Sequence, residues 1–272
     1  MIDLHIHSTA SDGTCTPEEL VKLAVNLGLK VIAIADHDSV DGIQPAIDEA
    51  SKQGIEVIPA IELSSDLEGR DIHILGYFID YKHPWFEHHL KDLRKARYER
   101  ALKMVKRLQE VGLDILVKDV LKHTADGTAV GRAHLAQAMR EKGYVDSIQE
   151  AFDRYIGKDG PCYVEKSIYS PREVIKIIKQ VNGIPILAHP GISKVDEFIP
   201  DFIDAGLQGL EAYHSRHGRA QTLKYKRLAK KLGLIVTGGS DFHGLSVGLL
   251  IGSVNVPDSI VDDLKRLKQP TA

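Results

Sequence analysis

The sequence predicts an α/β protein in which parallel strands alternate with helices. Short runs rich in valine and isoleucine at 31–35, 57–61 and 184–188 have the length and composition of buried strands. The order from Ile2 to about Ala60 is strand, helix, strand, helix, strand, which is the order of parallel βαβ units. At 272 residues the chain has room for one large barrel or for two ordinary domains.

Capping residues mark the predicted helix boundaries. The segment Thr16-Pro17-Glu18-Glu19 has a hydroxyl cap, a proline at the first helical position and a glutamate three residues after the cap. Ser170-Pro171-Arg172-Glu173 repeats the arrangement, so a helix is expected to begin at each place. Gly28 and Gly54 follow amphipathic stretches, where a left-handed residue commonly ends a helix.

The chain after Glu62 is predicted to return as an antiparallel strand. The interval from Glu62 to Ile72 is too short for a helical crossover, and residues 66–69 suit a turn. In a hairpin the start of the second strand lies beside the end of the first. We therefore expect His73 to lie near Glu62.

A helical insertion is predicted between two parts of the barrel. The strand signal disappears over 84–158, and apolar residues recur there at roughly helical spacing. These residues are Leu90, Leu93, Tyr98, Leu102, Val105 and Leu108. Because such a stripe needs a partner surface, we expect residues 84–158 to cover the active-site mouth of a barrel formed by 1–83 and 159–272.

Composition excludes several classes of protein. The chain carries 35 Lys+Arg against 38 Asp+Glu, and this near balance argues against wholesale wrapping by nucleic acid. No apolar run approaches the ~18 residues of a membrane span, and the first predicted strand begins too early to leave room for a secretory signal. Cys15 and Cys162 form no paired motif. A cytoplasmic enzyme without a membrane contact or an obligate protein partner is expected.

Metal-binding side chains collect where the predicted strands stop. The carboxyl ends of parallel barrel strands form one rim, at which active sites are found, so ligands distant in sequence would meet there. These side chains are His5, His7, His37, Glu62, His189, Asp241 and His243. One buried histidine is usually satisfied by a hydrogen bond, but this whole set favours metal ions as the partners.

Neighbouring acidic residues have more than one interpretation. Asp12 in Ser11-Asp12-Gly13-Thr14 is either a turn residue or a ligand. Asp36 and Asp38 flank His37 and are expected to orient its ring rather than to bind metal. Glu62 is the best candidate to bridge two ions, because a carboxylate has two oxygens.

Together these motifs resemble the PHP (polymerase and histidinol phosphatase) superfamily over nearly the whole chain. The matching segments are His5-Ile6-His7-Ser8, Asp36-His37, Glu62 with His73, Ala188-His189-Pro190 and Gly239-Ser240-Asp241-Phe242-His243. The likeness is greatest to small phosphoesterases with a helical insertion, among them nucleoside 3′,5′-bisphosphate phosphatases and 5′-to-3′ exonucleases acting on short RNA.

The resemblance implies a distorted (β/α)7 barrel, similar to a TIM barrel, and up to three divalent ions. Carried over by position, the ligands would be His5, His7, Glu62 and Asp241 for one ion, Glu62, His73 and His189 for a second, and Asp12, His37 and His243 for a third. Manganese is the expected metal, and iron or zinc would also suit mixed imidazole and carboxylate ligands.

Substrate contacts are expected from a few further positions. Arg132 in Gly131-Arg132-Ala133-His134 could hold a second phosphate, or could be a solvated residue at the start of a helix. His134 and Ser8 are the other expected substrate-binding residues. His214 follows a predicted strand and could protonate the leaving oxygen, so that His214 and Asp12 are the catalytic candidates. Arg216, His217 and Lys166 are open to either an anion pocket or a solvated loop.

The predicted activity is hydrolysis of nucleotide phosphate monoesters, a nucleoside 3′,5′-bisphosphate or AMP, with 5′-3′ exonucleolytic cleavage of short RNA as an extension. The expected partner is thus a small phosphorylated nucleotide or a short single-stranded RNA. Histidinol-phosphate phosphatase and a nucleotide-binding PHP module without turnover are the alternatives. An amidohydrolase is disfavoured, because no lysine at a strand end is suited to bridging metals.

Overall fold

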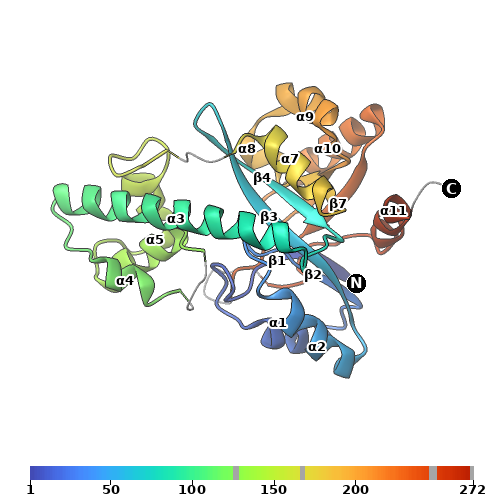
Figure 1. Ribbon diagram of the computed structural model, residues 1–272, viewed down its shortest axis with the longest axis horizontal. Helices are drawn as coiled ribbons and strands as arrows, with labels where there is room; N and C mark the ends of the chain where they lie inside the picture. The colour runs from blue at the N-terminus through green and yellow to red at the C-terminus, as the bar shows by residue number, and fades with distance from the viewer. Residues whose placement is uncertain (125–128, 166–168, 245–249, 270–272) are drawn as a thin grey trace.

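The computed structural model describes residues 1–124, 129–165, 169–244 and 250–269. Its centre is a seven-stranded sheet whose strands lie in sequence order, with helices around it (Figure 1). The strands are β1 Ile2–Ile6, β2 Val31–Ile34, β3 Glu56–Leu67, β4 Arg70–Tyr77, β5 Ile184–Leu187, β6 Gly209–His214 and β7 Ile235–Gly239. The predicted α/β class is confirmed.

Hydrogen bonds beyond β7 tie the two edges of the sheet together. His7 N donates to Phe242 O at 2.9 Å, and Asp241 N donates to His5 O at 2.8 Å. Pairing is parallel except that β4 runs antiparallel to both β3 and β5. This single reversed strand distorts the barrel, as the family resemblance implies.

Helices connect the strands and begin where the capping residues predict. Thr16 and Ser170 each form a capping box with the glutamate three residues later. The helices are α1 Pro17–Asn26, α2 Ile43–Gln53, α3 Pro84–Glu110, α4 Val117–Leu121, α5 Arg132–Glu141, α6 Ile148–Ala151, η1 Phe152–Ile156, α7 Pro171–Gln180, α8 Pro190–Ser193, η2 Asp196–Phe198, α9 Ile199–Ala205, α10 Arg219–Leu232 and α11 Ser259–Lys268. Over the described ranges, none combines the length and the apolar character needed to cross a membrane.

The predicted hairpin is confirmed. Strand β4 runs back along β3 with His73 opposite Ser64 and Leu75 opposite Glu62. His73 Nδ1 consequently lies 2.9 Å from Glu62 Oε1. The turn between the strands thus brings His73 beside Glu62, which lies in the middle of β3, without any crossover helix.

The barrel interior is apolar at the end where the strands begin. Leu4, Ile58, Tyr77 and Ile186 belong to one buried cluster, and residues of α11 pack against the same cluster. Ile2 at the start of β1 bridges Val256 just before α11. Helix α11 therefore lies at the amino ends of the strands, and the carboxyl ends remain available for a site.

The side chains of β1 do not alternate strictly between two faces. Leu4 belongs to the interior cluster, whereas Ile6 packs with α1 and α2. The register of β1 against β2 shifts between Asp3 and Ile6, which changes the face that successive side chains occupy.

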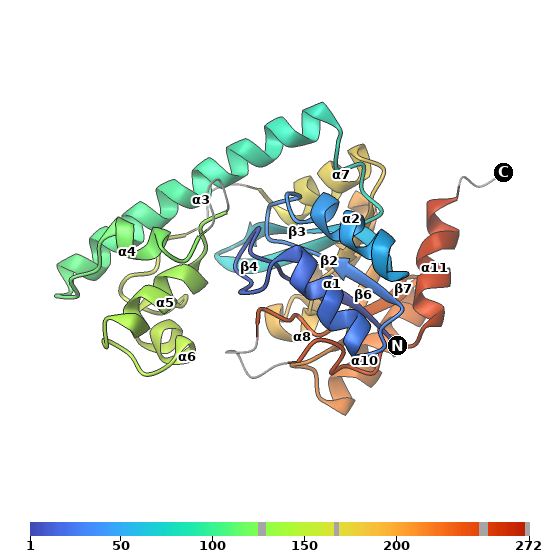
Figure 2. The same ribbon diagram turned by 90° about the horizontal axis from the view of Figure 1, so that it is seen from below.

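Helix α3 spans two separate cores (Figures 1 and 2). Its first half contributes Phe86, Leu90 and Leu93 to a core shared with the barrel. Its second half packs with α4 to η1 in a core that we call the distal core. The buried members of the distal core are Ala101, Met104, Val105, Leu108, Leu113, Ile115, Val120, Val130, Leu135, Ala136, Ala138, Met139, Val145, Ala151, Ile156 and Cys162.

The predicted apolar stripe of α3 is partly wrong. Tyr98 and Leu102 are 39% and 37% exposed. Between the two cores the buried face instead carries Arg97, which is 8% exposed. Arg97 was missed because a charged residue does not register as part of an apolar stripe.

Candidate metal centre

The ends of β1 and β7 bring the first two predicted ligands together. His5 and His7 are fully buried, and their Nε2 atoms lie 3.1 Å apart. Gly239 lets the end of β7 pack closely against β1, because a Cβ atom there would lie 2.4 Å from the backbone nitrogen of His5. Two imidazole nitrogens that face each other so closely are well suited to sharing a cation.

The carboxylate of Glu62 lies at the centre of the cluster. It is fully buried at the point where β3 passes the end of β2. Its nearest ring nitrogens are His73 Nδ1 at 2.9 Å, His189 Nε2 at 2.9 Å, His37 Nδ1 at 3.0 Å, and Nε2 of His5 and of His7 at 3.3 Å each. Because these contacts divide between its two oxygens, Glu62 has the geometry of a bridging carboxylate.

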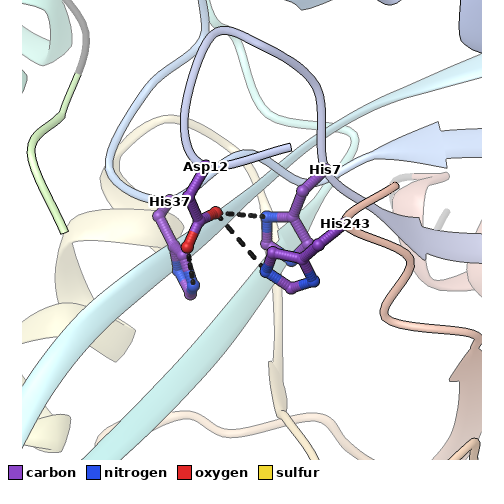
Figure 3. Close-up of side chains that lie close together, drawn as sticks. All are labelled: His7, Asp12, His37 and His243. Carbon is purple, nitrogen blue, oxygen red and sulfur yellow. Dashed lines mark ion pairs between the residues drawn. The ribbon is translucent and has the colours of Figure 1, made fainter. Parts of the chain in front are cut away.

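A second carboxylate, Asp12, points toward the rings of His7, His37 and His243 (Figure 3). Its oxygens lie 3.4 Å from His243 Nε2, 3.8 Å from His7 Nδ1 and 4.0 Å from His37 Nε2. Asp12 is thus a potential ligand, and the interpretation as an ordinary turn residue does not account for these three rings.

Asp241 completes a group of potential ligands with His5, His7 and Glu62. Its Oδ1 lies 3.1 Å from His7 Nε2 and 3.4 Å from His5 Nε2, and its Oδ2 lies 3.3 Å from His214 Nε2. Asp241 has a φ of 57° and His189 has a φ of 30°. Left-handed backbone is costly for residues with a side chain, and such strain is concentrated at functional sites.

Opposite charges set the protonation of the cluster. Burial alone would lower the pKa of His73, but the charges of Glu62 and Asp71 outweigh it and raise this pKa to about 9. Burial alone would raise the pKa of Glu62, but His37 and His73 hold this pKa well below its usual value. Burial, reinforced by His7 and His73, lowers the pKa of His37 well below its ordinary value. A neutral imidazole is the form that binds a metal ion.

Unpartnered polar atoms indicate that the cluster fits divalent cations. Buried polar atoms normally have hydrogen-bond partners, yet five here have none among the described residues. They are His7 Nδ1, Asp12 Oδ1, His37 Nδ1, Glu62 Oε2 and His189 Nδ1. A mixed set of imidazole and carboxylate donors suits manganese, iron or zinc.

Three groups of potential ligand atoms correspond to the expected ions, with one difference. The groups are His5, His7, Glu62 and Asp241, then His7, Asp12, His37 and His243, and then His37, Glu62 and His73. The last group contains His37, and His189, which the resemblance places with Glu62 and His73, lies with its Nε2 2.9 Å from Glu62 Oε1.

Glu211 was missed by the sequence analysis. It is fully buried, its Oε1 lies 2.9 Å from His5 Nδ1, and its Oε2 accepts a hydrogen bond from His189 N at 2.8 Å. A register shift between Glu211 and Tyr213 lets Glu211 and His214 face the same side of β6. An acidic residue inside a buried strand was the available signal.

The acidic neighbours of His37 do not orient its ring as predicted. Asp36 accepts hydrogen bonds from Ser8 N, Ser8 Oγ and Ser11 Oγ at 2.8, 2.6 and 2.5 Å. Asp38 accepts from Ser64 N at 2.8 Å and from Arg97 Nε. They hold the loop after β1 and helix α3, respectively.

The side chains of three predicted residues are engaged within the protein. Ser8 is fully buried with its hydroxyl bound to Asp36, so its placement does not support contact with a substrate. His134 is buried and caps α5 by accepting from Gly131 N at 3.0 Å. The buried side chain of His214 contacts Asp241 and does not line the cavity that Asp241 lines, which does not support proton transfer to a leaving group.

Among the cavities that open beside the cluster, two adjoin each other at Asp12 and Arg132. The larger, of about 430 Å3, is lined by Asp12, Asp241 and His243 from the cluster and by Arg132 and Arg216. The smaller, of about 170 Å3, shares Asp12 and Arg132 with it. Arg132 thus lies at the junction of the two cavities.

His217, which was also considered for an anion pocket, is not among the residues that line these cavities. His217 Nε2 accepts from Gly191 N at 3.1 Å, and its Nδ1 lies 3.1 Å from Ala212 O. Lys166 lies outside the described residues.

Comparison with known proteins agrees with this geometry. The PHP domain model matches residues 3–165, a range that holds β2 to β4 and six of the predicted ligands: His5, His7, Asp12, His37, Glu62 and His73. The chain belongs to the PHP family. A 5′-3′ exoribonuclease of Haemophilus influenzae is 35% identical over 95% of this chain and 96% of its own length. A 3′,5′-nucleoside bisphosphate phosphatase of Chromobacterium violaceum is 30% identical over 91% of this chain and 88% of its own.

The same fold occurs in a solved structure. The chain superposes with a TM-score of 0.91 on a candidate metal-dependent phosphoesterase of Bifidobacterium adolescentis. The two are 31% identical over 98% of this chain and 96% of the other. The PHP fold implied by the motifs is therefore confirmed.

Proposed function

We propose that this PHP protein is a metal-dependent phosphoesterase that hydrolyses phosphate esters of nucleotides. The observation that carries the proposal is a cluster of imidazoles and carboxylates at the wall of a cavity of about 430 Å3 that also contains Arg132 and Arg216. Arginine binds phosphoryl oxygens through pairs of charge-assisted hydrogen bonds. An anionic ester would therefore be held against the cluster.

Up to three divalent ions are proposed to bind here, with manganese as the first choice. The ligands would be His5, His7, Glu62 and Asp241 for one ion, Glu62 and His73 with His37 or His189 for a second, and Asp12, His37 and His243 for a third. When bound, such ions polarise phosphoryl oxygens and lower the pKa of water.

The chain's own residues are assigned different tasks. Arg132 and Arg216 would orient the ester, and Asp12 would contact it because its carboxylate lines both cavities. His214 and Glu211 would act as positioning residues, since each contacts a ligand and neither lines a cavity beside the cluster.

A nucleoside is the proposed bulk of the substrate. The larger cavity has an apolar wall of Ala133, Ile148 and Phe152, together with the amides of Gln137 and Gln149. An aromatic ring and amide groups suit a purine or pyrimidine base. The names of two relatives support AMP, a nucleoside 3′,5′-bisphosphate or the 5′ end of a short RNA as substrate.

Residues 84–158 are proposed to form an insertion that covers the mouth of the barrel. Support comes from the larger cavity, whose walls come from the cluster on one side and from α5, α6 and η1 on the other. The distal core continues to Cys162, which supports a boundary somewhat later than 158.

The test is phosphate release from a panel of AMP, adenosine 3′,5′-bisphosphate, histidinol phosphate and a 5′-phosphorylated short RNA. We expect release from the nucleotides, loss of it after chelation and recovery on adding Mn²⁺. Glu62→Gln should abolish it. Glu110→Gln is the control, because it makes the same chemical change at the far end of α3, where the Glu110 side chain is 61% exposed. Phosphate release should be unchanged in this variant. Full activity after exhaustive metal removal would overturn the proposal.

Two alternatives have distinct outcomes in the same assay. A histidinol-phosphate phosphatase would prefer histidinol phosphate over every nucleotide. A binding module without turnover would take up stoichiometric metal and release phosphate from no member of the panel.

A further inference from the structure

One stretch of the surface is much more basic than the chain as a whole. Residues 216–231, which contain α10, hold seven of the 35 lysines and arginines and no aspartate or glutamate, although the whole chain has a formal net charge of −3. All seven cations are exposed: Arg216, Arg219, Lys224, Lys226, Arg227, Lys230 and Lys231. Such a concentration of one sign of charge favours an anionic partner.

Most of these cations lack the ion pairs that other helices provide. In α3, for example, Lys91 lies 2.8 Å from Glu87 one turn away. In α10, Lys224 contacts Asp196 of η2, whereas the other cations of the helix form no ion pair within 1–124, 129–165, 169–244 and 250–269. They can therefore bind an external anion without giving up a partner in the protein.

The helix dipole explains only part of this charge. Lys230 and Lys231 lie in the last turn of α10, where the dipole stabilises cations. Arg219 is the first residue of the helix, and the partial positive charge of a helix N-terminus disfavours a cation there. Helices α1 and α7 instead have glutamates in their first turns. Helix stability thus accounts for the two terminal lysines but not for Arg219 or Lys226.

The cations of α10 form a stripe along the helix. Arg219, Lys226 and Lys230 are spaced by seven and four residues, which places them on one face. Tyr225 and Ala229 are the buried residues of the helix. The 14 residues of α10 span about 21 Å, which equals about six nucleotides at the ~3.4 Å spacing of one stacked strand. The stripe is long enough to contact several phosphates.

This stripe begins beside the larger cavity. Strand β6 ends at His214, and Arg216, two residues later, lines that cavity. Helix α10 starts three residues further along the chain. In Figure 2, α10 lies along the same lower edge of the molecule as α6, whose Ile148 and Gln149 also line the cavity. A long ligand whose end lies in the cavity would therefore meet α10 as it leaves.

We propose that the exposed cations of α10 bind the phosphodiester backbone of a single-stranded RNA whose 5′ end occupies the larger cavity. The inference rests on the proposed phosphoesterase function and adds a binding surface outside the catalytic site. A cavity of about 430 Å3 has the size for a small ligand such as one strand end, and not for a duplex. Because lysine and arginine contact phosphates without reading bases, the surface should favour longer RNA of any sequence.

The test measures binding of 5′-phosphorylated oligouridines of two, four and eight nucleotides by fluorescence anisotropy. The full chain is treated with a chelator, so that no probe is hydrolysed, and the salt concentration is about 0.1 M. Affinity should rise with length. Arg219→Gln, Lys226→Gln and Lys230→Gln combined should weaken binding of the longest probe about 10- to 100-fold, and binding of the shortest less than about 3-fold. The slope of log K against log salt should become shallower by about 2, since each lost phosphate contact contributes about 0.7.

The matched control removes three cations from the opposite side of the molecule. Lys95→Gln, Lys103→Gln and Lys106→Gln change exposed residues of α3, which lies along the upper edge of Figure 2. RNA binding should stay within about 2-fold of the unmodified chain, because distant charges are screened. Equal losses in the two triple variants, or an affinity independent of length, would overturn the surface. Tighter binding to an RNA duplex of eight base pairs, or to vesicles containing phosphatidylserine, would also overturn it.

The surface and the proposed phosphoesterase function can fail separately. In the Mn²⁺-loaded chain the α10 variant should keep the KM for AMP, because none of its three altered residues lines a cavity beside the cluster. Length-dependent RNA binding that the α10 variant loses would support the surface even if no phosphate were released. Release from AMP together with unchanged RNA binding by the α10 variant would refute the surface alone.

Discussion

Replacing Arg97 by methionine tests whether a buried ion pair fastens α3 to the barrel. The side chains of Arg97 and Asp38 are 9% and 0% exposed. Arg97 also donates from Nη2 to Ser64 Oγ at 2.5 Å. Arg97→Met keeps most of the apolar stem and removes both contacts, and among the described residues the buried Asp38 carboxylate then keeps the hydrogen bond from Ser64 N alone.

The expected loss follows from that burial. Removing one partner of a buried pair costs about 3–5 kcal/mol, because the remaining charge stays uncompensated. An unfolding entropy of about 2.1 cal/mol/K per residue gives about 570 cal/mol/K for this chain, so the Tm should fall by about 5–9 °C. Urea and thermal unfolding followed by circular dichroism measure both quantities.

Two further variants test whether the loss of stability in Arg97→Met comes from the buried, unpaired charge of Asp38. Arg94→Met removes a similar contact one turn earlier, where Asp41 is 57% exposed, and should cost under about 1 kcal/mol. Arg97→Met with Asp38→Asn should regain much of the loss, since asparagine tolerates the φ of 49° at that position. If Arg97→Met matches Arg94→Met, or if the double variant recovers nothing, the reasoning is refuted.

Three other predictions concern the cluster. Ser8→Ala should lower stability by about 1–2 kcal/mol through the loss of its bond to Asp36 and leave KM unchanged; a raised KM with intact stability would restore Ser8 as a substrate contact. Glu211→Gln should weaken metal binding about 10- to 100-fold through misorientation of His5, which metal titration measures, and unchanged affinity would contradict that role. Gly239→Ala should abolish metal binding or folding, because its Cβ would collide with the backbone of His5; a well-folded variant with full metal content would count against this contact.

Most of the cluster was predictable because strand ends are visible in sequence. Glu62 and His189 end short apolar runs, and parallel strands deliver their ends to one rim. His73 followed from the length of one hairpin. These inferences depend only on local patterns and on the geometry of parallel sheets.

The errors have a common physical origin in irregular backbone and in buried charge. Register shifts separated Leu4 from Ile6 and turned Glu211 toward the cluster, and a period of two cannot anticipate them. Arg97 went unnoticed because its role depends on Asp38, which is distant in sequence. The predicted roles of Ser8 and His214 stay predictions, and the contacts of their side chains with Asp36 and Asp241 could not be read from local sequence.

The division of α3 between two cores has an evolutionary consequence. Drift among distal-core residues such as Met104 and Leu135 can reshape the wall that faces the substrate, while His5, His7 and Glu62 stay in a different packing environment. Selection can therefore act on substrate range and on hydrolytic chemistry almost independently. A lineage with this architecture can acquire new substrates by gradual change around the distal core, without passing through an inactive ancestor.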